Sequence, residues 1–243
     1  MDNRPIAFFD SGIGGSTILR EVIKKIPNEH YIYLPDSNHN PYGNKSKEEL
    51  FEIVDKCVQR LLIYNPKIIV CACNTATAMV LDDIRKKYSD IIFVGTEPAI
   101  KVVYDNFCDK KCIILTTKGT GDSEKFNNLL NKYKTSNSVL VEAPLLAGLI
   151  ENGKDAFPYL NDLLSNYKDV DMVVLGCTHF PLVKDEISKI LGPVSFIDGG
   201  IGIANRVNFL LTENDMFSDN EFDLAILTDD NDIKSRILGI INN

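Results

Sequence analysis

The chain has 243 residues, of which 44% are hydrophobic and 25% charged, a globular composition with room for two compact lobes of about 100 residues each. Its formal net charge is −8, and the acidic residues are scattered along the chain, so nucleic acid is not an expected partner. The N-terminus lacks the basic and apolar stretches of a signal peptide, and no segment offers about 18 consecutive apolar residues. We therefore expect a cytoplasmic protein that does not enter a membrane.

Short β-branched runs alternate with longer amphipathic stretches from end to end, which predicts the α/β class with a parallel sheet covered by helices. Several of the runs are continuously apolar, as strands buried on both faces are. The expected strands are residues 6–9, 31–34, 67–72, 91–94, 111–115, 138–142, 171–175, 194–197 and 222–227.

The first two amphipathic stretches carry clear helix signals. An apolar stripe runs from Ile18 to Ile26 and is ended by Pro27. Ser46 and Glu49 then form a capping box that opens the next helix. Cys57 lies on the apolar stripe of that second helix, which predicts a core residue.

Six cysteines should remain reduced, because the cytoplasm opposes structural disulfides. They show no paired clusters at zinc-finger spacing, and the three histidines are not spaced as paired ligands, so no metal site is expected. The cysteines are therefore candidates for packing or catalysis: Cys57, Cys71, Cys73, Cys108, Cys112 and Cys177.

Residues 68–75 and 172–179 resemble each other, since each is a buried strand that ends in a cysteine followed by small polar residues. Cys73 and Cys177 lie 104 residues apart, a spacing that suggests one such strand end in each of two similar lobes. Ligands of open α/β sheets bind at the carboxyl ends of strands, so a site between facing lobes can receive both thiols. We expect residues 1–95 and 206–243 to form the first lobe and residues 96–205 the second.

Each thiol is expected at a strand-to-helix junction, where the helix N-terminus favours the thiolate, the form that takes a proton. The alternative for a single buried cysteine is inert packing. His179 is two residues from Cys177 and can tune its proton, although a lone histidine is often a structural residue. Glu151 follows an apolar run and would be a plain helix-end charge in most proteins.

The loop from Asp10 to Gly15 follows the first expected strand and opens the first helix. Its backbone N–H groups can hold an anion there, or its glycines can serve only to reverse the chain. It matches neither the phosphate-binding nor the dinucleotide-binding glycine pattern. Asp10 sits where a carboxylate can touch the catalytic group of a neighbouring strand.

Three segments together resemble one known family, the glutamate racemases: residues 10–12 (Asp-Ser-Gly), 73–76 (Cys-Asn-Thr-Ala) and 176–182 (Gly-Cys-Thr-His-Phe-Pro-Leu). Their joint occurrence in this order is highly specific. The resemblance runs from about residue 5 to residue 210. Further matches are Asp36 with Pro41-Tyr42-Gly43, residues 95–101, residues 117–120, and residues 198–200 before Arg206-Val207.

The resemblance implies two flavodoxin-like lobes with the active site between them, and racemisation of L- and D-glutamate without pyridoxal phosphate, metal or other cofactor. It also implies a homodimer and a role in supplying D-glutamate for peptidoglycan. Cys73 and Cys177 become the two bases, with Asp10 assisting the first, and His179 and Glu151 the second. The implied substrate-binding residues are Asp10, Ser11, Tyr42, Gly43, Asn74, Thr75, Thr117, Thr120, Thr178 and His179.

Other functions stay open at this point. An aspartate racemase, or a related isomerase or decarboxylase, would share the fold, although a one-thiol decarboxylase has no need of the second cysteine. A non-catalytic anion-binding protein would not need two thiols at equivalent strand ends. A thiol redox protein would be expected to carry a C-x-x-C motif, which is absent.

Overall fold

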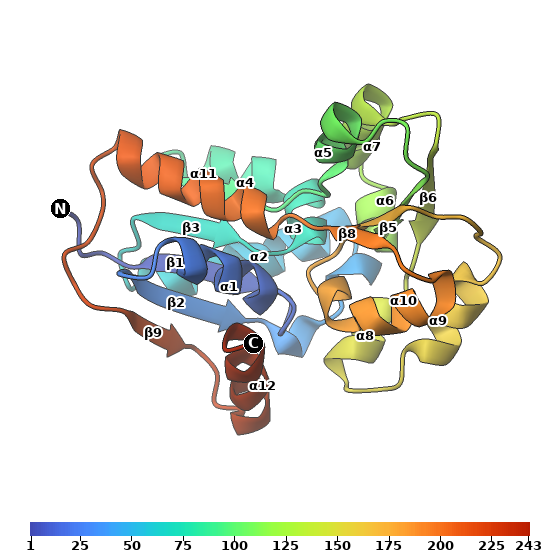
Figure 1. Cartoon of the computed structure of the whole chain (residues 1–243). Coiled ribbons are helices and arrows are strands. Elements are labelled where there is room, and N and C mark those ends of the chain that lie inside the picture. Colours follow the sequence, from blue (N-terminus) through green and yellow to red (C-terminus); the bar gives the residue numbers. More distant parts are fainter.

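A computed structural model describes all 243 residues, and it places two parallel sheets in two lobes side by side (Figure 1). The nine strands lie where the sequence predicts them, with ends that move by one or two residues, and the α/β class is confirmed. The first sheet has the order β4-β3-β1-β2-β9, with β1 (Ile6–Asp10), β2 (His30–Pro35), β3 (Ile68–Cys71), β4 (Phe93–Gly95) and β9 (Asp223–Ile226). The second has the order β6-β5-β7-β8, with β5 (Cys112–Thr116), β6 (Ser138–Glu142), β7 (Met172–Gly176) and β8 (Ser195–Ile197).

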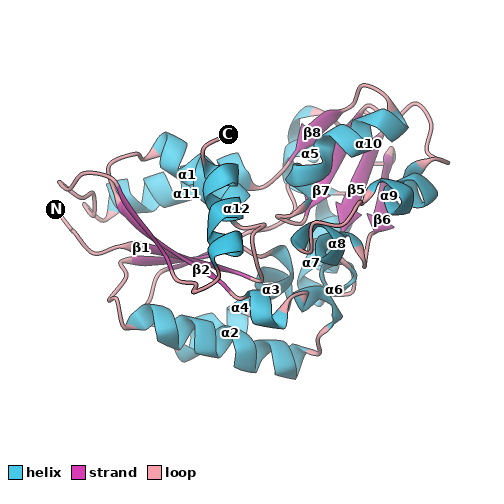
Figure 2. Cartoon of the chain, turned by 90° about the horizontal axis from the view of Figure 1, so that it is seen from below, coloured by secondary structure: helices cyan, strands magenta, loops and turns pink.

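Helices cover both sheets (Figure 2). None of them combines the length and the apolar character needed to cross a membrane. The first lobe holds α1 (Ser16–Lys25), α2 (Lys47–Leu62), α3 (Asn74–Met79), α4 (Leu81–Lys87), α11 (Gly200–Glu213) and α12 (Asn231–Ile241). The second holds α5 (Ile100–Asn106), α6 (Lys118–Gly121), α7 (Glu124–Tyr133), α8 (Leu146–Glu151), α9 (Phe157–Leu164) and α10 (Lys184–Leu191). Three short 3-10 helices are η1 (Ser37–His39), η2 (Tyr42–Asn44) and η3 (Phe180–Val183).

The strands are apolar throughout because both faces of each sheet are covered. In the first lobe, Ile6 packs toward α1, α11 and α12, while its neighbour Ala7 packs toward α2, α3 and α4. In the second lobe, Ile113 packs toward α8, α9 and α10, while Ile114 packs toward α5 and α7. The alternation gives each lobe two hydrophobic layers, one on each face of its sheet.

The two helix signals of the N-terminal third are confirmed. Helix α1 covers the predicted stripe, and Ser46 caps α2 by accepting the backbone N–H of Glu49 at 3.1 Å. Cys57 is buried in the core between α2 and the first sheet.

Both lobes share one strand order around their first strand. β2-β1-β3-β4 in the first lobe corresponds to β6-β5-β7-β8 in the second, which is the flavodoxin-like order. Ligands of such sheets bind where the order reverses, between the first and third strands. Asp10 ends the first of these strands and Cys73 follows the third in the first lobe, and Thr117 and Cys177 follow the corresponding strands in the second. Each cysteine therefore stands at the topological switch point of its lobe.

The C-terminal segment returns to the first lobe, since β9 pairs with β2 and Ile237 of α12 is buried in the first lobe's core. Helix α11 spans residue 205, and Ile203 and Val207 both pack in that same core. The division at residues 95 and 205 stays a proposal.

A fully buried ion pair lies at the amino ends of the strands in the first lobe, opposite the carboxyl ends that face the site. Lys67 Nζ donates to Glu29 Oε2 at 2.6 Å, and it also donates to the carbonyl oxygens of Asp2 and Met216 at 2.7 and 2.8 Å. Glu29 in turn accepts the backbone N–H of Ser218 at 3.0 Å. Since every hydrogen-bonding group here is paired, the cluster ties the N-terminus and the segment after α11 to the sheet.

Replacing Lys67 by Met should destabilise the fold by about 3 kcal/mol, because it leaves the Glu29 carboxylate buried without its charge partner. Denaturant unfolding of Lys67→Met measures this loss. The control Lys168→Met removes an exposed lysine whose side chain makes no hydrogen bond or ion pair, and it should change stability by less than about 0.5 kcal/mol. Equal stability of the two variants would show that the ion pair does not tie this end of the lobe.

Candidate active site

Both predicted catalytic thiols lie where the strand ends of the two lobes meet, and both are nearly closed off from solvent. Cys73 is the N-cap of α3 and is 5% exposed, while Cys177 follows β7 and is 7% exposed. Asp10 ends β1 and is fully buried. The structure thus gathers these three groups from strand ends of both lobes.

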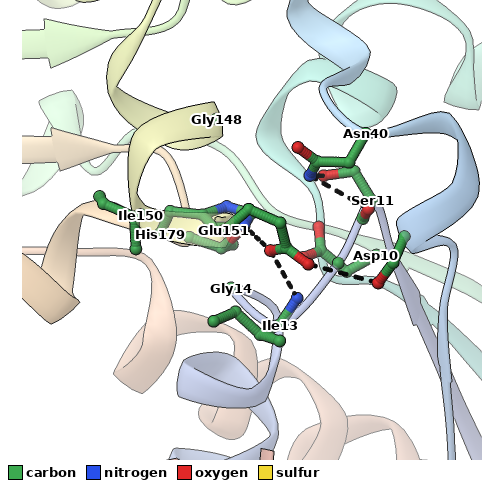
Figure 3. A network of polar contacts seen from close by, with 12 residues as sticks. Asp10, Ser11, Ile13, Gly14, Asn40, Gly148, Ile150, Glu151 and His179 are labelled. Atoms are coloured by element: carbon green, nitrogen blue, oxygen red, sulfur yellow. Dashed lines mark hydrogen bonds and ion pairs between the residues drawn. The ribbon is translucent and has the colours of Figure 1, made fainter. Parts of the chain in front are cut away.

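Glu151 joins the two lobes from the last position of α8 (Figure 3). Its Oε2 accepts the backbone N–H of Ile13 at 3.0 Å and the Nε2–H of His179 at 2.7 Å. Its Oε1 accepts the Ser37 hydroxyl at 3.3 Å. The carboxylate therefore contacts the glycine loop and η1 of the first lobe and the histidine of the second.

His179 is held between Glu151 and Cys177. Burial opposes the charged imidazole, but Cys177, Glu151 and Asp10 outweigh it and raise the pKa of His179 to about 10. Burial likewise opposes charge on Glu151, yet His179 and the Ile13 N–H hold the pKa of that carboxyl below its usual value. The Nδ1 of His179 lies 3.8 Å from the Cys177 Sγ. The arrangement thus favours a proton on His179, between the Glu151 carboxylate and the Cys177 sulfur.

Asp10 has one satisfied and one free oxygen. The Gly15 N–H donates to its Oδ2 at 2.7 Å, whereas its buried Oδ1 has no hydrogen-bond partner. Burial raises the pKa of Asp10 to about 6, although the His179 charge works against the rise. The free oxygen of a carboxyl with such a pKa can take or give a proton near neutral pH.

The surroundings of Cys73 favour a neutral thiol in the closed site. Burial raises its pKa well above the usual value, and Asp10, Cys71 and Cys177 raise it further, while the Ala76 N–H lowers it. We expected the helix N-terminus to favour the thiolate. At this residue its effect is smaller than that of burial and of the neighbouring carboxyl, because the lobes close over the thiol.

Three threonine hydroxyls form a second cluster across the lobes. Thr75 Oγ1 of α3 lies 3.0 Å from Thr117 Oγ1 and 3.4 Å from Thr120 Oγ1 of the second lobe. Thr117 also caps α6 by accepting the Thr120 N–H at 3.2 Å. Since Thr75 is two residues from Cys73, this group of hydroxyl donors stands beside the first thiol.

The loop that carries Tyr42 and Gly43 borders the threonine cluster. The Tyr42 hydroxyl donates to Asp36 Oδ2 at 2.7 Å, so this side chain is engaged in the lobe core and leaves only its backbone for a ligand. The Gly43 N–H has no acceptor within the protein. A Cβ at Gly43 would lie 3.3 Å from the Thr117 Cβ, so the loop and the cluster are in contact.

The remaining predicted binding residues are buried at the same strand ends and are partly engaged. Asn74 Nδ2 donates to the Thr96 carbonyl at 3.3 Å, and its backbone N–H has no acceptor. The Ser11 and Thr178 carbonyl oxygens accept from Asn40 Nδ2 and Thr17 Oγ1, each at 3.1 Å. Thus these three residues keep some of their polar groups free for a ligand.

Two glycines make the interlobe contact sterically possible. A Cβ at Gly12 would lie 2.3 Å from Glu151 Oε2, and one at Gly14 would lie 2.4 Å from His179 Nδ1. The loop predicted as an anion cradle thus receives an anion of the protein itself, the Glu151 carboxylate. Sequence reasoning missed the Ile13 N–H and the Ser37 hydroxyl as its partners, since neither residue type carries a motif signal.

Comparison with known proteins assigns the chain to a family. Residues 21–206 match the family model described as Asp/Glu/Hydantoin racemase. A glutamate racemase of Clostridium novyi is 42% identical to this chain, over 86% of this chain and 84% of the relative. One of Clostridium perfringens is 40% identical, over 91% of this chain and 88% of the relative.

Solved structures agree. A Francisella tularensis glutamate racemase in complex with D-glutamate is 27% identical, with a TM-score of 0.82 over 100% of this chain and 95% of that one. An Escherichia coli glutamate racemase, in complex with L-glutamate and an activator, is 28% identical, with a TM-score of 0.83 over 98% and 94%. The identities and coverage together show that this chain is an isomerase of the Asp/Glu/hydantoin racemase family and belongs to its glutamate racemases.

Proposed function

We propose that this enzyme interconverts L- and D-glutamate by a two-base proton transfer between Cys73 and Cys177 and needs no cofactor. The observation that carries the proposal is the placement of one thiol at the switch point of each lobe, at strand ends that meet. Inversion at an α-carbon requires a base on one face and an acid on the other. Two thiols from opposite lobes meet that need, and they exchange roles when the reaction runs in reverse.

Each thiol has a different assistant. Asp10, with its free Oδ1, takes the proton that Cys73 must lose before it can act as a base. His179, fixed by Glu151, donates from Nδ1 toward the Cys177 sulfur and moves a proton there. Residues 10, 73, 151, 177 and 179 therefore act as two units, one on each face of the substrate.

Substrate carboxylates are held by neutral donors. The hydroxyls of Thr75, Thr117 and Thr120 and the free N–H groups of Gly43 and Asn74 supply them. Preorganised dipoles of this kind contribute several kcal/mol in a dry site. No lysine stands among the proposed site residues, and lysine is the residue that anchors pyridoxal phosphate in enzymes that use it. Ser11 and Thr178 complete the proposed binding set around the amino group.

Entry of glutamate requires the lobes to part, because both thiols are less than a tenth exposed. Closure then expels water and strengthens every electrostatic contact around the carbanion-like state. We also propose that the product D-glutamate serves peptidoglycan synthesis. The expected homodimer and cytoplasmic location stay predictions.

Purified enzyme should form D-glutamate from L-glutamate without pyridoxal phosphate and in the presence of a metal chelator, because thiols alone move the proton. Chiral chromatography of reactions with L-glutamate, L-aspartate and L-alanine measures both activity and specificity. Activity that disappears on chelation would contradict the cofactor-free reaction. Faster turnover of L-aspartate would make the enzyme an aspartate racemase.

Asp10→Asn should lower kcat in the direction where Cys73 acts as base, while it stabilises the fold at pH 7.5 by about 3 kcal/mol. Its folded pKa of about 6 exceeds the unfolded 3.8, so wild-type stability falls as the pH rises through this window. The amide avoids that cost, and the difference should vanish below about pH 3, where the carboxyl is protonated in both states. Denaturant unfolding at both pH values measures it.

The matched control for this variant is Asp229→Asn, which removes an exposed carboxylate that makes no hydrogen bond or ion pair and should change neither kcat nor stability. An Asp10→Asn protein that is less stable than wild type at pH 7.5 would mean that the ionised Asp10 stabilises the fold. Unaltered kcat in both directions would remove Asp10 from the proton transfer.

In D2O, the product α-carbon should carry deuterium from the earliest times, while recovered substrate is labelled more slowly. The reason is that the product takes its hydrogen from the opposite cysteine, which has exchanged with solvent beforehand. Cys73→Ala and Cys177→Ala should each abolish racemisation, and the exposed Cys108→Ala should retain it. Unlabelled D-glutamate from the wild type, or racemisation by either active-site variant, would refute the pairing of the two thiols.

A further inference from the structure

The C-terminal helix α12 reaches from the first lobe to the second. Ile237 is fully buried in the first lobe's core, and Ile233 and Ile240 pack against the same core, so the helix is fixed there. Arg236 precedes Ile237 and is half-buried. Its NH1 donates to the carbonyl oxygen of Glu151 at 2.6 Å, and its NH2 donates to that of Ile150 at 2.9 Å.

The two carbonyls that Arg236 binds end α8 in the second lobe. Ile150 packs in the second lobe's core, while Glu151 turns its side chain to His179 and Ile13. Within the protein, Arg236 is the only donor to the Glu151 carbonyl oxygen. A cation at a helix C-terminus satisfies carbonyls that lack intrahelical donors and interacts favourably with the helix dipole.

We propose that Arg236 is a positioning residue for catalysis, which anchors the last turn of α8 from the opposite lobe and so keeps the Glu151 carboxylate on His179. The inference rests on the proposed function of Glu151 and His179 and deepens it. Because the guanidinium comes from the first lobe and its acceptors from the second, the anchor forms only when the lobes are closed. Closure would then complete the unit that assists Cys177.

The charges around Glu151 agree with this role. His179 contacts the carboxylate from the second lobe, the Ile13 N–H and the Ser37 hydroxyl contact it from the first, and Asp10 is the other acidic group near His179. Burial, the largest effect, raises the pKa of Glu151, while His179 and the Ile13 N–H lower it. The charge of Arg236 lowers this pKa further, by a smaller effect. Loss of Arg236 should therefore weaken both the placement and the ionisation of this carboxylate.

The imidazole of His179 provides a direct measurement in the resting enzyme. The chain has three histidines, so 15N-histidine labelling gives a simple NMR spectrum in which His179→Asn identifies the His179 signals. The Nε2–H bound to Glu151 is buried and should give a sharp downfield proton signal in the wild type. In Arg236→Gln this proton signal should shift or become too broad to detect.

Lys234→Gln is the matched control, because it removes the same charge from an exposed position on the same helix. It should leave the His179 signal and kcat/KM unchanged, whereas Arg236→Gln should lower kcat/KM roughly ten- to hundredfold, as small misplacements of catalytic groups do. Arg236→Lys keeps the charge but can reach the two carbonyls less well, so it should give intermediate values. If Arg236→Gln does not fold, the His179 signal and kcat/KM of Arg236→Lys test the positioning role instead.

An unchanged His179 signal in folded Arg236→Gln would overturn the proposal, as would an equal effect of Lys234→Gln. The NMR comparison does not depend on turnover. If wild-type enzyme failed to racemise glutamate, the proposed function would fall, while the link from Arg236 to His179 would still be measured.

Discussion

The buried carboxylate of Glu151 is the contact on which the arrangement of the site depends. A buried carboxylate costs free energy unless charged and hydrogen-bonding partners surround it. Its partners come from both lobes, with Ile13 and Ser37 on one side and His179 on the other. The placement of the lobes and the orientation of the imidazole are therefore fixed together. A change in either one removes a partner from a carboxylate that is only 8% exposed.

The glycine loop takes its form from this constraint. The carboxylate of Glu151 and the ring of His179 lie so close to Gly12 and Gly14 that a Cβ at either glycine would overlap them. Helix α1 begins directly after this loop, and its N-terminus adds a favourable field for negative charge. The loop is thus an anion site already occupied by the protein, and the proposed function therefore assigns the substrate carboxylates to the donors around Thr75.

The sequence predicted the strands because buried parallel strands are continuously apolar, and it predicted both thiols because each follows such a strand. The shared strand order gives the two thiols equivalent places in their lobes, and docking of the lobes brings those places together. The interlobe partners were not predictable, since Ile13 and Glu151 are 138 residues apart and meet only through docking of the lobes. Arg236 lies beyond residue 210, where the sequence motifs that resemble the family end. The raised pKa of Cys73 also depends on closure, which a local helix N-terminus does not reveal.

Cys73 and Cys177 occupy equivalent positions in the two lobes, but their electrostatic surroundings are opposite. Cys73 has the acidic Asp10 beside it, and this carboxyl and burial favour the neutral thiol. Cys177 has His179 beside it, an imidazole whose pKa is raised by its acidic neighbours and whose ring is held by Glu151. Two-base racemisation requires one thiol and one thiolate at the start of each turnover, and identical surroundings would give no preference for either. In the proposed mechanism the different neighbours of the two thiols supply that preference, and the ammonium group of a bound amino acid would offset the charge of Asp10 and allow the roles to exchange.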